Sequence, residues 1–378
     1  MFAPNKKDPY YYDLKFLESL LYCPRRNSEL KKYKITSALI RFLTSFPWTA
    51  CLVYCIISIK DLSNDLEVFV ELTNCMLVCI FYQIKWERWF RFYRDICDTS
   101  VYGSPPTAFR AYKIASRFSV VYITNSCIAI ISHSINSLTF KNALCVKLKE
   151  QKNWNKICGT IVSMWYPGGE PSTILKIIFN IYQVFSAATY MLTATVLIAM
   201  NWKTGALIVA KIHHLKARFF HVFEGNSALE VRQRMRAWIQ YHCEIIRFTS
   251  EFNKLTKIMF GQVSFLSALI VGCNADQVSN GKVLAAFTHF LAYFGALFAL
   301  CEIGQRIQDE TVNIEEAIYA SDWYSYLRFA KDVQLILIRC QKPLVMETTP
   351  LGTFSYALPI IVLKTAYSYF ALLTNTTK

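Results

Sequence analysis

Residues 173–200 read TILKIIFNIYQVFSAATYMLTATVLIAM, an apolar run that holds a single charged side chain, Lys176. A helix that crosses the hydrocarbon core of a bilayer needs about 20 mainly apolar residues, and this run is longer than that. Seven stretches of the chain have this character, so the sequence predicts an all-α, polytopic membrane protein with seven transmembrane helices. The stretches are residues 37–58, 66–84, 115–136, 173–200, 255–274, 283–304 and 352–374.

The composition of the whole chain supports the same class. Hydrophobic residues make up 54% of the 378 residues and charged residues only 18%, whereas a soluble domain carries roughly 25% charged residues. A net charge of +15 on a soluble protein would indicate a nucleic-acid partner. Here the basic residues lie between the apolar runs, which is typical of membrane topology. The composition therefore argues against a soluble enzyme and against a nucleic-acid-binding protein.

The distribution of basic residues predicts the orientation of the chain. The first 26 residues lack the apolar core of a signal peptide, so we expect the N-terminus to stay on the cytosolic side. With that orientation, about 30 Lys and Arg residues lie in the inner segments and about 8 in the outer ones. Seven spans then place the C-terminus outside, which is opposite to the orientation of a G-protein-coupled receptor.

Two apolar stretches contain polar side chains: Glu67 and Glu71 in residues 66–84, and Asn125 and His133 in residues 115–136. Polar groups inside a membrane segment usually face the interior of a helix bundle or a water-filled cavity. We therefore expect these groups to face inward.

The inner linkers are predicted to be helices rather than flexible loops. Apolar residues recur at spacings of three and four through residues 201–254, and the segment after the sixth span behaves in the same way. We expect the linkers to form an intracellular helical layer, mainly 201–254 and 305–342, within one domain that covers 1–378. In the largest outer loop, residues 137–172, Cys145 and Cys158 are candidates for a disulfide.

No pattern in the sequence indicates catalysis or a metal site. GxSxG, HExxH and a glycine-rich phosphate loop are absent, and the adjacent His213 and His214 lack the spacing of two metal ligands on one helix face. The acidic run 309–316 lacks the spacing of an EF-hand. We expect no enzymatic activity and no cofactor.

The last span carries a polar stripe, broken by a leucine, that would suit the wall of a water-lined path. In such helices Ser and Thr also hydrogen-bond to their own backbone, and the residues alone do not decide between the two interpretations. The stripe comprises Ile361, Thr365, Ser368, Leu372 and Asn375.

The last 80 residues resemble the insect odorant receptor family in the order and spacing of five short blocks. The blocks are CEIGQ (301–305), AIYASDWY (317–324), RCQKPL (339–344), GTF (352–354) and LKTAYSYFALL (363–373). The resemblance implies seven helices with the orientation found above, and four subunits around one cation-conducting pore that the final helix (352–374) lines. It places the pore constriction at Leu372, Asn375 and Thr376.

The resemblance also implies the partners and the location. The linker between the fourth and fifth spans is too short for the shared co-receptor, so the chain looks like an odorant-binding subunit that assembles with the co-receptor in a heterotetramer. An intracellular anchor provides most intersubunit contact in the family, and we expect multi-pass insertion in the plasma membrane, in the dendritic cilia of olfactory sensory neurons. The anchor positions are Tyr319, Trp323, Leu327, Leu335 and Pro343.

In the family, volatile odorants bind in the outer half of the bundle between the second and sixth spans, in a pocket expected to be mainly aromatic and aliphatic. Ordinary helix packing is the alternative explanation for each candidate residue. The candidates are Phe69, Thr73, Ile128, Ile131, Phe179, Tyr182, Phe185, Ser186, Thr189, His289, Phe290 and Tyr293. Three other classes remain. The tail signature argues against a gustatory-receptor-like channel, and the orientation argues against a G-protein-coupled receptor. The lack of paired broken helices argues against a secondary transporter.

Overall fold

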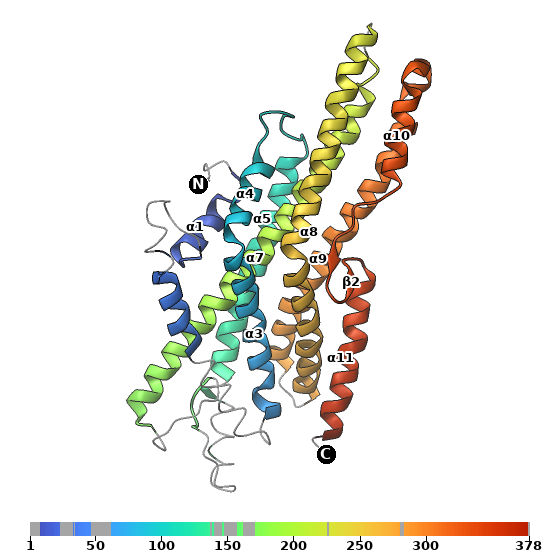
Figure 1. The fold of residues 1–378 in the computed structure, drawn as a ribbon. Coiled ribbons are helices and arrows are strands. Elements are labelled where there is room, and N and C mark those ends of the chain that lie inside the picture. Colours follow the sequence, from blue (N-terminus) through green and yellow to red (C-terminus); the bar gives the residue numbers. More distant parts are fainter. Residues whose placement is uncertain are drawn as a thin grey trace.

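Long helices dominate the computed structural model, which describes residues 8–22, 33, 35–46, 62–136, 138–139, 146, 157–161, 171–224, 227–279 and 283–376 (Figure 1). Besides a helix at Ile35–Phe46, its elements in chain order are α1 (Tyr11–Ser19), α3 (Leu62–Ile84), α4 (Trp86–Cys97), α5 (Ala108–Asn136), α7 (Thr173–Phe220), α8 (Ala228–Ser279), α9 (Val283–Tyr319), the 3-10 helix η4 (Asp322–Phe329), α10 (Ala330–Cys340), β1 (Glu347–Thr348), β2 (Gly352–Thr353) and α11 (Ala357–Thr376).

Helix α7 is the central element of the bundle, because it packs against α3, α5, α8 and α9. It begins where Ser172 accepts a hydrogen bond from the backbone N–H of Leu175, which satisfies one of the donors at the helix start. Its residues from Thr193 to Ile212 are buried without interruption. A helix that is buried on all sides lies in the core of the protein, and this one buries Lys203, which pairs with Asp13 of α1 at 2.6 Å.

Six of the seven predicted apolar stretches are helical wherever the structure describes them, and the seventh is helical from Ala357 onward. Within the described residues, four helices are long and apolar enough to cross a bilayer: Ala108–Ile135, Thr173–Phe220, Ala228–Ala275 and Ala286–Tyr319. Three shorter apolar helices, Ile35–Phe46, Phe69–Ile84 and Ala357–Leu372, coincide with the first, second and seventh predicted stretches. Residues 47–58 of the first stretch lie outside the described residues.

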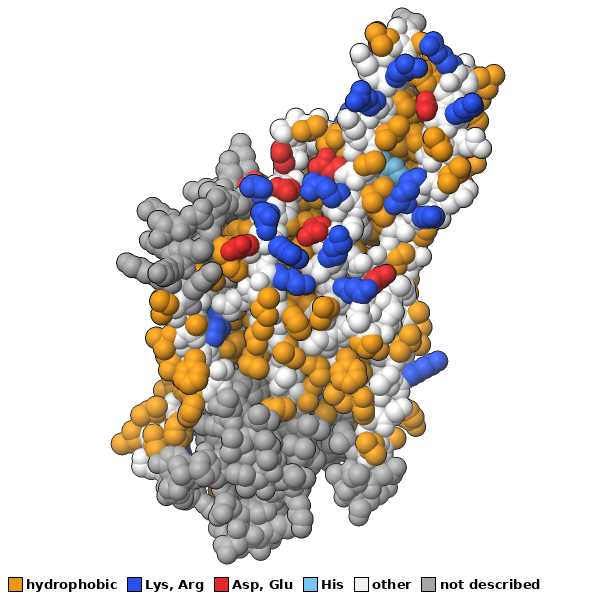
Figure 2. Space-filling model, viewed as in Figure 1, with side chains coloured by type: hydrophobic (Ala, Val, Ile, Leu, Met, Phe, Trp, Pro, Cys, Tyr) orange, Lys and Arg blue, Asp and Glu red, His pale blue; other side chains and the backbone are white. Residues whose placement is uncertain are grey.

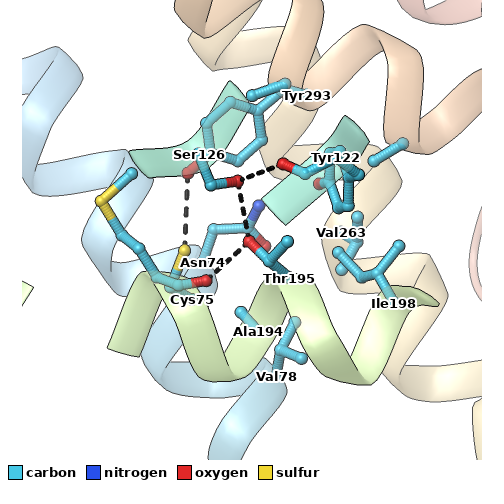
Figure 3. Close-up of a pocket in the computed structure, with 13 residues that line it drawn as sticks. Asn74, Cys75, Val78, Tyr122, Ser126, Ala194, Thr195, Ile198, Val263 and Tyr293 are labelled. Carbon is cyan, nitrogen blue, oxygen red and sulfur yellow. Dashed lines mark hydrogen bonds between the residues drawn. The ribbon is translucent and has the colours of Figure 1, made fainter. Parts of the chain in front are cut away.

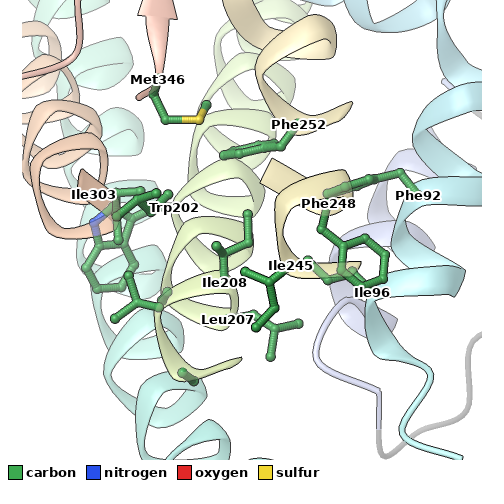
Figure 4. Packing of buried hydrophobic residues seen from close by; sticks show 14 of the residues in the cluster. Phe92, Ile96, Trp202, Leu207, Ile208, Ile245, Phe248, Phe252, Ile303 and Met346 are labelled. Carbon is green, nitrogen blue, oxygen red and sulfur yellow. The ribbon is translucent and has the colours of Figure 1, made fainter. Parts of the chain in front are cut away.

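The predicted helical extensions are confirmed. α7 continues to Phe220, α8 begins at Ala228, and α9 runs on to Tyr319. These extensions enclose an aromatic and aliphatic core with α4, in which Phe92 stacks on Phe252 at a centroid distance of 6.0 Å (Figure 4). On the face shown in Figure 2, Lys, Arg, Asp and Glu side chains gather over this upper part of the molecule, while the described residues below it present mainly hydrophobic side chains.

The seventh segment differs in one respect from its prediction as a helix over 352–374. Gly352 and Thr353 form β2, which pairs antiparallel with β1, so α11 begins only at Ala357. The hairpin docks on α8, where a Cβ on Gly261 would lie 1.7 Å from the carbonyl oxygen of Thr349. This close approach of two backbones requires glycine.

Cys158 is disulfide-bonded, as its place in the predicted outer loop suggested. Its predicted partner, Cys145, lies outside the described residues.

Candidate functional site

A small cavity lies inside the bundle, where α3, α5, α7, α8 and α9 come together (Figure 3). Its volume is about 30 Å³, which is room for one or two water molecules. The lining is mostly apolar. It comprises Asn74, Cys75, Val78, Tyr122, Ser126, Met191, Ala194, Thr195, Ile198, Val263, Ala292, Tyr293 and Ala296.

The polar groups at the cavity have partners within the protein. The Ser126 hydroxyl lies 2.9 Å from the Thr195 hydroxyl, which links α5 to α7. The hydroxyl of Tyr293 lies 3.5 Å from the sulfur of Cys75, and this contact links α9 to α3 (Figure 3). Asn74, also on α3, accepts a hydrogen bond from the side-chain amide of Gln262 on α8. The lining thus offers apolar area with a few fixed polar groups, as sites for small organic ligands do.

A buried ionisable pair lies behind the Tyr293 side of the cavity. Nδ1 of His289 on α9 lies 2.5 Å from a carboxylate oxygen of Glu71 on α3, and both side chains are 3% exposed. Tyr293, one turn along α9, donates its hydroxyl to the backbone carbonyl of Glu71 at 3.3 Å. The ring of His133 lies 5.6 Å from that of His289. Ionisable groups at this depth are rare in membrane helices and usually pair with one another.

Of the predicted ligand residues, Tyr293 alone lines the cavity, and His289 lies behind it. Phe69 is half-buried and packs against the small cluster that contains Tyr293. Phe290 stacks on Phe294 at 5.0 Å instead. Thr73 donates its hydroxyl to the carbonyl of Phe69 on its own helix.

The remaining predicted positions lie elsewhere on the bundle. Tyr182 and Ser186 donate hydroxyl hydrogen bonds to the backbone of the Ile35–Phe46 helix, and Thr189 donates to its own helix. Phe179 is half-buried. The side chains that point away from the bundle are Ile128, Ile131 and Phe185.

The sequence reasoning missed twelve of the thirteen lining residues, because it chose positions near the outer ends of the helices. On α7 the lining begins at Met191, beyond every predicted position, and on α5 it uses Tyr122 and Ser126. One pattern in the sequence could have indicated these residues: hydroxyl-bearing residues that lie close to small residues such as Ala194 and Ala292. Small side chains leave space between helices.

Helix α11 lies at the edge of the bundle and packs chiefly on α8 (Figure 1). At their contact, a Cβ on Gly272 would lie 3.0 Å from the carbonyl oxygen of Ala366. The buried face of α11 comprises Leu358, Pro359, Val362 and Ala366. The described members of the polar stripe are all exposed: Ile361, Thr365, Ser368 and Leu372.

Both interpretations of that stripe have a structural basis. Thr365 and Ser368 donate their hydroxyls to carbonyls one turn earlier, at 2.9 and 3.2 Å. Their oxygen atoms nevertheless lie on a face that the chain itself leaves uncovered. The side chains of Asn375 and Thr376 lie outside the described residues.

The predicted anchor positions also leave apolar surface uncovered. Leu327 is 74% exposed and Leu335 66% exposed, and Tyr319 is exposed as well. Trp323 and Pro343 are half-buried. The segment is helical as predicted but is kinked, since Tyr326 adopts φ −123° and ψ 56° inside η4. Tyr324 and Ile338 of the same segment are exposed too, and exposed apolar side chains that gather in one place are a feature of surfaces that bind another protein.

The family model described as 7tm Odorant receptor matches residues 58–367, which is most of the chain. The chain belongs to the odorant receptor family. This confirms the resemblance found in its last 80 residues.

Curated odorant receptors match over part of the chain. The odorant receptor coreceptor of Ooceraea biroi is 27% identical over 151 residues, which cover 38% of this chain and 32% of the coreceptor. Odorant receptor 67a of Drosophila melanogaster is 27% identical over 150 residues, 38% of this chain and 37% of that receptor. The match thus spans about a third of each relative's length.

The fold extends the likeness to the whole chain. The structure of the insect olfactory receptor OR5 from Machilis hrabei in complex with eugenol has a TM-score of 0.75 at 15% identity, covering 98% of this chain and 100% of that one. A second structure of the same receptor has a TM-score of 0.74. This odorant receptor therefore shares the fold of that receptor over 98% of its length.

Proposed function

We propose that this odorant receptor is the odorant-binding subunit of a ligand-gated, non-selective cation channel that it forms with the co-receptor. One observation carries the proposal: a single chain leaves both the stripe on α11 and the leucines of the anchor exposed. Assembly around a central pore would cover the leucines and turn the stripe toward an aqueous path.

The chain would cross the plasma membrane of dendritic cilia seven times, with its N-terminus inside and its C-terminus outside. The concentration of basic residues in one half of the molecule supports this orientation (Figure 2). Extracellular antibody labelling of a C-terminal tag, without labelling of an N-terminal one, is the expected result. The reverse pattern would favour a G-protein-coupled receptor.

The ligand would be a small volatile molecule with much apolar area and few hydrogen-bonding groups. The cavity of about 30 Å³ is too small for such a molecule, so binding requires side chains to move apart. Tyr122, Met191 and Tyr293 are the largest side chains of the lining, and they can do so by changing rotamers.

Gating would follow from the helix contacts at the cavity. Val263 on α8 lines the cavity, and the same helix carries Gly272 against α11. A ligand that wedges the bundle apart favours a conformer in which α8 and α11 shift and Leu372 moves away from the pore axis. The ligand drives this change only as far as it binds the open conformer more tightly than the closed one.

The test is a current recording from cells that express the chain alone and with the co-receptor, during perfusion of aromatic, ester and terpene odorants. The proposal requires an odorant-evoked cation current that needs both subunits and persists when G-protein signalling is blocked. A response that G-protein inhibitors abolish would refute it.

A further inference from the structure

A basic groove lies where α3 ends and α4 begins, apart from the ligand cavity and from α11. It faces the Ile35–Phe46 helix and has a volume of about 670 Å³. Among the described residues, three basic side chains and one acidic side chain line it, which gives them a net charge of +2 (3 − 1). The described lining residues are Tyr33, Ser37, Gln83, Ile84, Lys85, Trp86, Glu87, Arg88 and Arg91.

The groove lies at the boundary between the apolar and the charged halves of the molecule. The apolar run of α3 ends at Ile84, which is 72% exposed, and the α4 sequence WERWFRFYRDIC begins two residues later. Trp86 packs edge-on against Tyr33, at a centroid distance of 6.3 Å. Tryptophan and tyrosine gather at membrane–water interfaces, where one end of the ring system is apolar and the other wet.

The basic side chains have no carboxylate partner among the described residues. Arg88 and Arg91 are exposed and three residues apart, so they lie on one face of α4. Lys85 donates to the backbone carbonyl of Lys254 at 3.3 Å, which holds it against α8. By contrast Arg94, one turn further along, forms an ion pair with Asp95 at 3.1 Å.

An apolar path leads from the groove toward the hydrophobic half. Ile80 lies one turn before Ile84 on the same side of α3, and both are exposed. A molecule with an anionic head in the groove could therefore lay a hydrocarbon tail along this stripe. A free inorganic or soluble phosphate would leave the stripe uncovered.

We propose that this groove binds an anionic phospholipid with a phosphorylated headgroup. Arg88, Arg91 and Lys85 contact the phosphates, and the acyl chains follow Ile80 and Ile84. Basic pockets between membrane helices are suited to such headgroups, and each Lys or Arg near an anionic surface adds attraction. The site goes beyond odorant binding and needs only that this end of α3 lies at a membrane surface.

The probe is a fluorescent short-chain phosphatidylinositol bisphosphate, titrated with the purified full-length chain in detergent. The variant Arg88→Gln/Arg91→Gln should bind it roughly 30-fold more weakly than the original chain, since two headgroup contacts are lost. The matched control is Arg232→Gln/Arg236→Gln, which removes the same charge from exposed positions of α8 outside the groove. The control should keep the original affinity.

Competition tests the lipid character of the ligand. Unlabelled phosphatidylinositol bisphosphate should displace the probe, whereas phosphatidylcholine should not, and soluble inositol trisphosphate should compete at least tenfold less well because it has no acyl chains. Equal weakening in the groove and control variants would overturn the proposal. So would equal competition by phosphatidylcholine or by inositol trisphosphate. Unchanged thermal unfolding midpoints establish that the variants are folded.

Discussion

Glu71 on α3 and His289 on α9 form a contact of 2.5 Å in the bundle, although 218 residues separate them in the chain. Removing one partner leaves the other buried among apolar helices, whereas replacing both with apolar groups removes the unpaired polar atoms as well. We therefore expect His289→Leu and Glu71→Leu each to destabilise the fold by about 3 kcal/mol, and the double variant to recover most of that loss.

Thermal unfolding midpoints and surface expression of the three variants give this double-mutant cycle. If the effects of the two single substitutions simply add in the double variant, the pair does not act as a unit.

Tyr293 forms part of the cavity wall and is the only predicted ligand residue in its lining. Tyr293→Ala should change the odorant concentration for half-maximal current by roughly tenfold, because a large apolar contact is lost, while surface expression stays near that of the original chain. Phe290→Ala is the matched control, since Phe290 lies three residues away and outside the lining. Equal losses of sensitivity and expression in Tyr293→Ala would make Tyr293 a packing residue.

Leu372 is exposed on α11 together with Thr365 and Ser368. If its side chain closes the pore, Leu372→Ala should raise the current in the absence of odorant. The substitution should leave folding intact, because Leu372 covers little of the bundle. A ligand-free current equal to that of the original receptor would rule out Leu372 as a gate.

Leu335 should lie at a contact between subunits. Leu335→Arg is expected to abolish co-purification with the co-receptor without lowering the unfolding midpoint of the chain, because the site is 66% exposed in the single chain. The control is Val101→Arg, at a site that is 75% exposed in the loop between α4 and α5. Undiminished co-purification of the Leu335 variant would place the interface elsewhere.

His242 on the charged half of α8 predicts a pH dependence of stability. Burial lowers the pKa of His242 to about 4, and the nearby Arg339 guanidinium acts in the same direction. The unfolded chain, with a pKa near 6.5, binds a proton in this range that the folded chain does not, so stability falls as the pH drops from about 6.5 to 4.

The loss from this group reaches about 3 kcal/mol at pH 4. Acidification should therefore lower the unfolding midpoint of the His242→Gln variant less than that of the original chain. The control His221→Gln, at an exposed histidine, should behave like the original chain. If the unfolding midpoints of the original chain and the two variants depend on pH in the same way, His242 does not cause the loss of stability in acid.

Much of the fold could be predicted because apolar runs and helical spacing are local properties of the sequence. The extensions of α7 and α9 followed from the spacing of their apolar residues, and the inward position of Glu71 followed from the cost of exposing a carboxyl group to lipid. The hairpin at Glu347–Thr353 could not be predicted, since its two short strands are held by contacts with α8.

The cavity was harder to predict because it depends on how far each helix is shifted along its axis relative to its neighbours. The spacing of apolar residues on α7 determines which face of the helix points inward. It does not determine which turn of α7 lies opposite Tyr293 of α9 across the cavity. The pairing of Glu71 with His289 could not be predicted for the same reason, although Glu71 was expected to face inward and His289 was a candidate ligand residue.

The most direct test of the central claim is whether Ser368 lines the path of the odorant-evoked current. Ser368→Cys, expressed with the co-receptor, should give a current that a charged, membrane-impermeant thiol reagent blocks during odorant application. Tyr367→Cys is the matched control, since Tyr367 is 72% exposed on another side of α11 and its current should persist. Block of the Ser368 variant alone is the predicted result; an odorant-evoked current that the reagent leaves unchanged in that variant would contradict a pore lined by α11.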